Sequence, residues 1–254
     1  MKLNYIKLGE GRPLLILHGL FGSLDNWKTL GNKFAEKYEV YLIDQRNHGK
    51  SPHSSEFDYQ AMSDDLFEFV EDHYLRGFYL LGHSMGGKTV MNFAQHCDLV
   101  GKMVVADIAP KAYTPYHIKL IESMEKVDFS ILHSRGEVET ILSRDITDLP
   151  IRQFLMKNLY WKEKNRLDWK INLPAIKENL TSIIGEIENA VVDIPTLFIR
   201  GENSNYIQDQ DIPKIKDQFP NSLVETIPKA GHWLHAENPS LFYELVDRFL
   251  EEDD

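Results

Sequence analysis

One serine lies in a setting where it could act as a nucleophile. The run GHSMGG at residues 82–87 follows the apolar segment Phe78–Leu81 and precedes a helix-like segment, Lys88–Gln95. This is a G-x-S-x-G pattern in the order strand, sharp turn, helix, and its glycines let the backbone present the Ser84 hydroxyl at the sheet edge. A helix N-terminus also favours a developing negative charge. The pattern predicts a nucleophile at Ser84, against the alternative of a tight turn with an incidental serine.

A serine nucleophile needs a base that titrates near neutral pH, and histidine meets that need. Of the ten histidines, His232 lies in a loop between an apolar strand-like run and the last helix-like segment, where Gly231 frees the backbone. We predict His232 as the base. His235, three residues on, suggests a metal pair, but no third ligand has a convincing spacing, so we predict no metal site.

A second glycine-containing segment could complete the site. The run HGLFGS at residues 18–23 follows the apolar run Leu14–Leu17. Such a strand end can aim a backbone N–H into the same cleft, where it would form an oxyanion hole with the N–H of Met85. We predict Leu20 as the donor, with Phe21 second. Taken alone, the segment fits a simple strand-to-loop turn better, and only its pairing with Ser84 favours the oxyanion hole.

Strands that alternate with helices must position these residues. Helix-period segments separate most of the apolar runs, which indicates a mostly parallel sheet with helices on both faces. The alternation breaks between about Lys111 and Asp193, where we expect a helical insertion that roofs the site. The sequence therefore predicts a core of residues 1–110 and 194–254 and a cap of residues 111–193. The strand-like runs are Leu14–Leu17, Val40–Ile43, Phe78–Leu81, Met103–Ala106, Thr196–Ile199 and Leu223–Ile227.

Four motifs in this order, HGLFGS, DQRNHGKS, GHSMGG and AGHWLHAENP, resemble the α/β-hydrolase superfamily and, more narrowly, the YbfF-like bacterial esterases. The resemblance covers the sheet domain from Leu14 to the C-terminus. It implies an eight-stranded sheet, a helical cap, a Ser-Asp-His triad in chain order, and hydrolysis of acyl esters or thioesters without a cofactor. The fold also hosts lyases and haloperoxidases with the same triad, and non-catalytic binding proteins, so these stay as alternatives.

The acid of the triad has two candidates. The superfamily most often places it after the seventh strand as G-x-x-D, but in the loop RGENSN at residues 200–205 Ser204 occupies that slot. Glu202 in the same loop would need a different path to reach His232. Asp107 closes the run Met103–Ala106, and a charge at the end of a buried strand is costly unless it is paired. The YbfF-like pattern also places the acid there. We predict Asp107, with Glu202 second.

Composition narrows the class of protein and its partners. The net charge of −11 argues against nucleic acid or anionic membrane as the main partner. The single cysteine, Cys97, excludes an internal disulfide and suits a reducing compartment. We find no secretory signal and no stretch of 18 apolar residues, so we expect a cytoplasmic protein without membrane insertion. The length of 254 residues fits one α/β domain with an insertion, or two small domains.

The substrate is expected to be a small-molecule ester or an acyl-CoA. The segment Met156–Lys170 carries five cations against two acids, which would suit the phosphates of an acyl carrier. A solvated helix face explains the same pattern. For the acyl pocket we predict four aromatic residues, although core packing also explains aromatics in the cap: Phe21, Tyr160, Trp161 and Trp233.

Overall fold

The computed structural model describes residues 1–252 and contains a seven-stranded sheet in the order β1-β3-β2-β4-β5-β8-β9. Only β1 runs antiparallel to its neighbour. The strands are β1 (Tyr5–Leu8), β2 (Arg12–Leu17), β3 (Tyr38–Ile43), β4 (Phe78–His83), β5 (Val100–Ala106), β8 (Thr196–Gly201) and β9 (Ser222–Ile227). The expectation of eight strands is therefore wrong by one. Six of the observed strands match the apolar runs of the sequence, whereas β1, which is not buried, matches none. The eighth strand is implied by the family resemblance alone.

Helices cover both faces of the sheet, and this explains why side chains on both sides of its strands are apolar. In β2 the side chains alternate, so Leu14 and Ile16 pack against one layer while Leu15 and Leu17 pack against the other. The first layer contains α1 (Lys28–Phe34) and α11 (Pro239–Glu251), and the second contains α2 (Tyr59–Asp72), α3 (Met85–Ala94) and α9 (Ile212–Gln218). Strand β4 is buried along its whole length, as expected for a parallel strand with helices on both sides.

Two helices of the core begin at identifiable caps. The Asp58 side chain accepts a hydrogen bond from the Ala61 N–H at the start of α2, and the Asn238 side chain accepts one from the Leu241 N–H at the start of α11. Pro239 occupies the first position of α11, where its missing N–H costs no hydrogen bond. In both helices a side chain thus satisfies one of the first backbone N–H groups.

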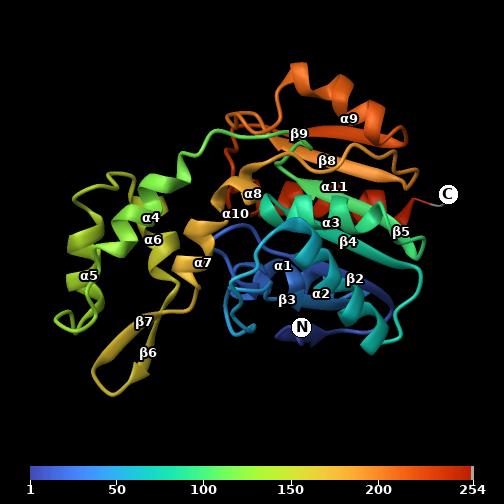
Figure 1. Cartoon of the computed structure of the whole chain (residues 1–254). Coiled ribbons are helices and arrows are strands. Elements are labelled where there is room, and N and C mark those ends of the chain that lie inside the picture. The colour runs from blue at the N-terminus through green and yellow to red at the C-terminus, as the bar shows by residue number, and fades with distance from the viewer. Residues whose placement is uncertain (253–254) are drawn as a thin grey trace.

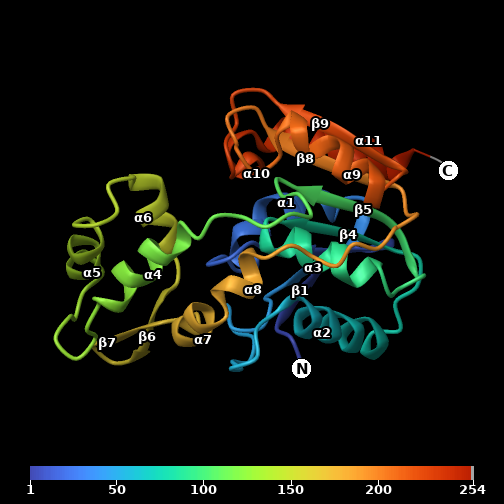
Figure 2. The ribbon, with the colours of Figure 1, turned by 45° about the horizontal axis from the view of Figure 1, so that its top comes forward.

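Between β5 and β8 the chain leaves the sheet and forms a separate group of elements, which Figures 1 and 2 both show to one side of the sheet. Residues 111–193 remain our proposed bounds for this cap. Its elements are α4 (His117–Glu125), α5 (Arg135–Leu142), α6 (Leu149–Met156), β6 (Leu159–Glu163), β7 (Arg166–Trp169), α7 (Leu173–Glu178) and α8 (Leu180–Ile184). No helix within residues 1–252 is long and apolar enough to cross a bilayer.

The cap is not purely helical, because β6 and β7 form an antiparallel hairpin. Asn165 in its turn has a φ of 62°, a left-handed conformation that asparagine tolerates better than most residues. Along β7, Leu167 and Trp169 are buried, whereas Asp168 between them is less so. This alternation has the period of a strand, and the interpretation of the basic segment as a helix face is therefore wrong.

Candidate active site

Ser84 occupies a sharp turn between β4 and α3. Its φ of 53° and ψ of −118° form a strained conformation for a residue with a side chain. The glycines beside it are required by space, since a Cβ on Gly82 would come within 2.2 Å of the Gly86 carbonyl oxygen. A Cβ on Gly86 would lie 2.5 Å from the Leu17 carbonyl oxygen of the neighbouring strand. The G-x-S-x-G pattern thus allows the close packing that holds the Ser84 hydroxyl at the end of β4.

The three predicted triad residues lie within hydrogen-bonding distance of one another. The His232 Nε2 atom is 3.1 Å from the Ser84 Oγ atom, and the His232 Nδ1 atom is 2.8 Å from the Asp107 Oδ2 atom. Ser84 follows β4, Asp107 follows the adjacent β5, and His232 lies in the loop between β9 and α10 (Leu234–Glu237). The parallel strands of one sheet end at the same edge, and this brings together residues that are up to 148 positions apart in the chain.

Asp107 is fully buried, and the loop after β8 supplies its other hydrogen bonds. The Gly201 N–H donates to the Asp107 Oδ1 atom at 3.2 Å, and the Ser204 hydroxyl donates to the Oδ2 atom. Glu202 is exposed and accepts a hydrogen bond from the Lys229 N–H at 2.7 Å. The loop after β8 thus places a hydrogen-bond donor, Ser204, beside the carboxylate of Asp107. The other candidate for the triad acid, Glu202, bonds to the Lys229 N–H instead.

Neighbouring rings hold His232 in place. The Tyr206 ring stacks on it with centroids 3.8 Å apart, and the His83 Nε2–H donates to the His232 carbonyl oxygen at 2.8 Å.

His235 stacks on Trp27 with centroids 4.4 Å apart, so packing accounts for the second histidine of the H-x-x-H pair. Within residues 1–252 no three His, Cys, Asp or Glu side chains gather as a metal site.

Burial sets the protonation states of the site. It lowers the pKa of His232 below the ordinary value of 6.5, so that the ring is neutral and able to accept a proton near pH 7. Burial raises the pKa of Asp107 to about 6, while the hydrogen bonds from Ser204 and the Gly201 N–H act in the opposite direction. These two donors therefore help to keep Asp107 ionised beside the ring.

Replacing Ser204 by alanine should shift the acidic limb of the kcat/KM profile to higher pH. The hydroxyl stabilises the ionised form of Asp107, so its removal raises the pKa of that carboxyl, and the ionised fraction is lost earlier as pH falls. A hydrogen bond to a charged group contributes roughly 1.5–3 kcal/mol, part of which water can replace, so we expect a shift of about one pH unit. A profile from pH 4 to 9 for wild type and Ser204→Ala tests this. An unmoved limb would contradict the role assigned to Ser204.

The predicted oxyanion donors lie at the ends of β2 and β4. A Cβ on Gly19 would come within 3.1 Å of the Ser84 Cβ atom, which shows how closely the loop after β2 approaches the serine. The Phe21 N–H already donates to the His48 Nε2 atom at 3.2 Å, which argues against the second-choice donor. Among residues 1–252 the N–H groups of Leu20 and Met85 have no hydrogen-bond acceptor. This pair remains our proposal for the oxyanion hole.

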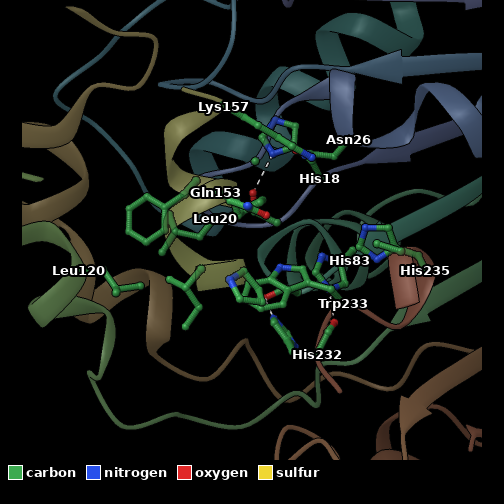
Figure 3. Close-up of a pocket in the computed structure, with 18 of the residues that line it drawn as sticks. His18, Leu20, Asn26, His83, Leu120, Gln153, Lys157, His232, Trp233 and His235 are labelled. Carbon is green, nitrogen blue, oxygen red and sulfur yellow. Dashed lines mark hydrogen bonds between the residues drawn. The ribbon is translucent and has the colours of Figure 1, made fainter. Parts of the chain in front are cut away.

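A cavity of about 600 Å³ is lined by Ser84 and His232. Figure 3 shows His232 and other side chains that line it. Two of the four predicted pocket aromatics, Phe21 and Trp233, line it. The sequence did not predict which side chains of the cap line this cavity. These residues belong to no motif, and only the packing of the cap against the core brings them to the site. The side chains that the cap supplies include Tyr116, Leu120, Ile151, Gln153, Phe154 and Lys157.

The predictions of Tyr160 and Trp161 as pocket residues need correction. Both belong to β6 of the hairpin, and neither lines the cavity. Trp161 is 52% exposed, and it forms a cross-strand pair with Leu167. Trp169 packs against Phe129 inside the cap, with ring centroids 5.4 Å apart. The hairpin places these aromatic side chains away from the serine.

Comparison with known proteins identifies the fold family of the chain. Residues 12–138 and 142–239 match the model of the alpha/beta hydrolase fold family. The chain is 33% identical over 242 residues to esterase YbfF of Escherichia coli, covering 94% of this chain and 93% of that protein. It is 38% identical over 249 residues to the sn-1-specific diacylglycerol lipase ABHD11 of Mus musculus, covering 93% of this chain and 80% of that protein.

A solved structure of higher sequence identity has the same fold. An esterase from a marine microorganism superposes with a TM-score of 0.95 at 46% sequence identity, covering 98% of this chain and 99% of that one. The chain therefore belongs to the α/β-hydrolase family. The resemblance to the YbfF-like esterases, first based on four short motifs, extends over nearly the whole length of both chains.

Proposed function

We propose that this protein is a serine hydrolase that cleaves carboxylic esters through a covalent acyl-enzyme. The observation that carries the proposal is the chain of hydrogen bonds from Ser84 through His232 to Asp107, at 3.1 and 2.8 Å. The relatives support the reaction class, since they include an esterase and a diacylglycerol lipase. Ester hydrolysis needs a nucleophile, a neutral base and a group that orients the base, and these three residues supply them.

In the proposed first half-reaction, the His232 Nε2 atom takes the hydroxyl proton while the Ser84 Oγ atom attacks the ester carbonyl carbon. The N–H groups of Leu20 and Met85 donate to the oxyanion that forms. The imidazolium, stabilised by ionised Asp107, then returns the proton to the departing alcohol as the C–O bond breaks. In the second half-reaction water replaces the alcohol, and the same proton transfers release the carboxylic acid and regenerate Ser84.

The apolar side chains around the cavity favour substrates with a hydrocarbon chain. Leu120, Ile151 and Phe154 of the cap line the same cavity as Ser84. Each additional buried methylene contributes about 0.8 kcal/mol, so kcat/KM should rise by up to about fourfold per methylene until the cavity is filled. Hydrolysis of p-nitrophenyl esters from acetate to palmitate measures this. A lack of turnover with every ester would contradict the proposal.

Acyl thioesters can react by the same steps, but the structure gives little support to a phosphate-binding patch on the cap. Lys162 pairs with Asp168 at 2.6 Å and Arg166 with Glu163 at 3.9 Å, so acidic neighbours offset these cations. We therefore expect the triple change Lys162→Gln, Lys164→Gln and Arg166→Gln to leave KM for acyl-CoA nearly unchanged. The same acyl chains offered as p-nitrophenyl esters and as CoA thioesters provide the comparison. A marked rise of KM for the thioesters alone would restore the patch.

A further inference from the structure

A buried asparagine of the cap contacts the loop that carries the proposed oxyanion donor. Asn158 lies between α6 and β6, is 3% exposed, and donates from its Nδ2 atom to the Phe21 carbonyl oxygen at 2.7 Å. The partners are 137 residues apart in the chain. The backbone of Asn158 is itself fixed, since its N–H donates to the Leu155 carbonyl oxygen and its own carbonyl oxygen accepts from the Lys170 N–H. The side chain is thus presented from a rigid part of the cap.

The peptide that Asn158 holds needs such support. Phe21 has a φ of 61°, a left-handed conformation that is unfavourable for a residue with a bulky side chain. From the core, His48 accepts the Phe21 N–H at 3.2 Å, and the Gly22 N–H closes the turn onto the Gly19 carbonyl oxygen at 2.9 Å. From the cap, Asn158 is the donor to the Phe21 carbonyl oxygen. The loop is therefore clamped from both sides, next to the N–H of Leu20.

We propose that Asn158 is a positioning residue through which the cap fixes the oxyanion loop against Ser84. The inference rests on the proposed function, because it assigns the Leu20 N–H to the oxyanion. Ile151, Phe154 and Lys157 precede Asn158 closely in the chain and line the cavity. The segment that lines the cavity is therefore the segment that holds the loop.

The test replaces Asn158 by leucine, which keeps the branched shape and the number of heavy atoms and removes the donor, and by alanine, which removes the donor without adding bulk. A displaced oxyanion donor acts on the transition state, so kcat should fall by roughly 10- to 100-fold while KM changes by less than about threefold. Affinity for an alkylboronic acid, which forms a tetrahedral adduct with a serine, should fall in parallel with kcat. The matched control is Asn179→Leu, which removes another hydrogen bond from a cap asparagine to a core carbonyl, that of Ser55 at 2.9 Å. It should retain wild-type kcat.

Two results would overturn the inference. One is a kcat of Asn158→Leu and Asn158→Ala within twofold of wild type. The other is a change of kcat, KM and melting temperature in Asn179→Leu that is as large as the change in the Asn158 variants. Such a result would indicate that both substitutions loosen the cap in general. Failure of the proposed function appears differently, as wild-type protein without ester turnover or boronate binding. If the Asn158→Leu variant does not fold, the Asn158→Ala variant still tests the inference.

Discussion

Replacing Asp107 by asparagine should lower kcat by about 10⁴-fold, as the equivalent change does in a serine protease triad. The structure explains why the effect should be large. The carboxylate accepts from the His232 Nδ1 atom at 2.8 Å, which leaves the Nε2 atom free to take the Ser84 proton. An asparagine that presents its amide nitrogen to the ring favours the wrong tautomer, and it removes the charge that stabilises the imidazolium.

The matched control is Glu202→Gln, which changes the competing carboxylate. Glu202 is exposed and bonds to the Lys229 N–H, so this variant should keep nearly wild-type kcat. Thermal melting of both variants separates catalysis from folding, because Asp107 also accepts hydrogen bonds from Gly201 and Ser204. A crippled Glu202→Gln enzyme beside an active Asp107→Asn enzyme would assign the acid to the loop after β8.

Replacing Ser84 by alanine should lower kcat by about 10⁶-fold, because without the nucleophile no acyl-enzyme can form and only the binding site remains. Within residues 1–252 the Ser84 hydroxyl has a single hydrogen-bond partner, His232, and the strained backbone stays the same. The melting temperature should therefore change little. Single-turnover assays at enzyme excess measure the residual rate. A residual kcat within about 100-fold of wild type would indicate a different nucleophile.

The parts of the site that the sequence predicted are those that local backbone geometry encodes. The strand–turn–helix order around Ser84 requires glycines at 82 and 86, and the structure shows the close contacts that exclude a Cβ there. A charge at the end of a buried strand needs a partner, and this need, together with the family pattern, favours Asp107. The structure places His232 and Ser204 beside it. Each of these predictions depends only on the residues at the end of a single strand.

The rest depended on contacts between distant segments. The basic segment of the cap has both strand-like alternation and charged residues, and its pairing into a hairpin moved Tyr160 and Trp161 away from the cavity. No local pattern indicates that α6 lines the cavity or that Asn158 reaches Phe21, because docking of the cap brings them together. The sheet also has seven strands where the resemblance implied eight.

Labelling with a fluorophosphonate, followed by mass spectrometry of the peptides, tests the proposed nucleophile most directly. The account predicts one adduct per chain on Ser84, formed more slowly in Asp107→Asn and absent from Ser84→Ala. An unlabelled wild-type protein, or an adduct on another residue with Ser84 unmodified, would contradict it.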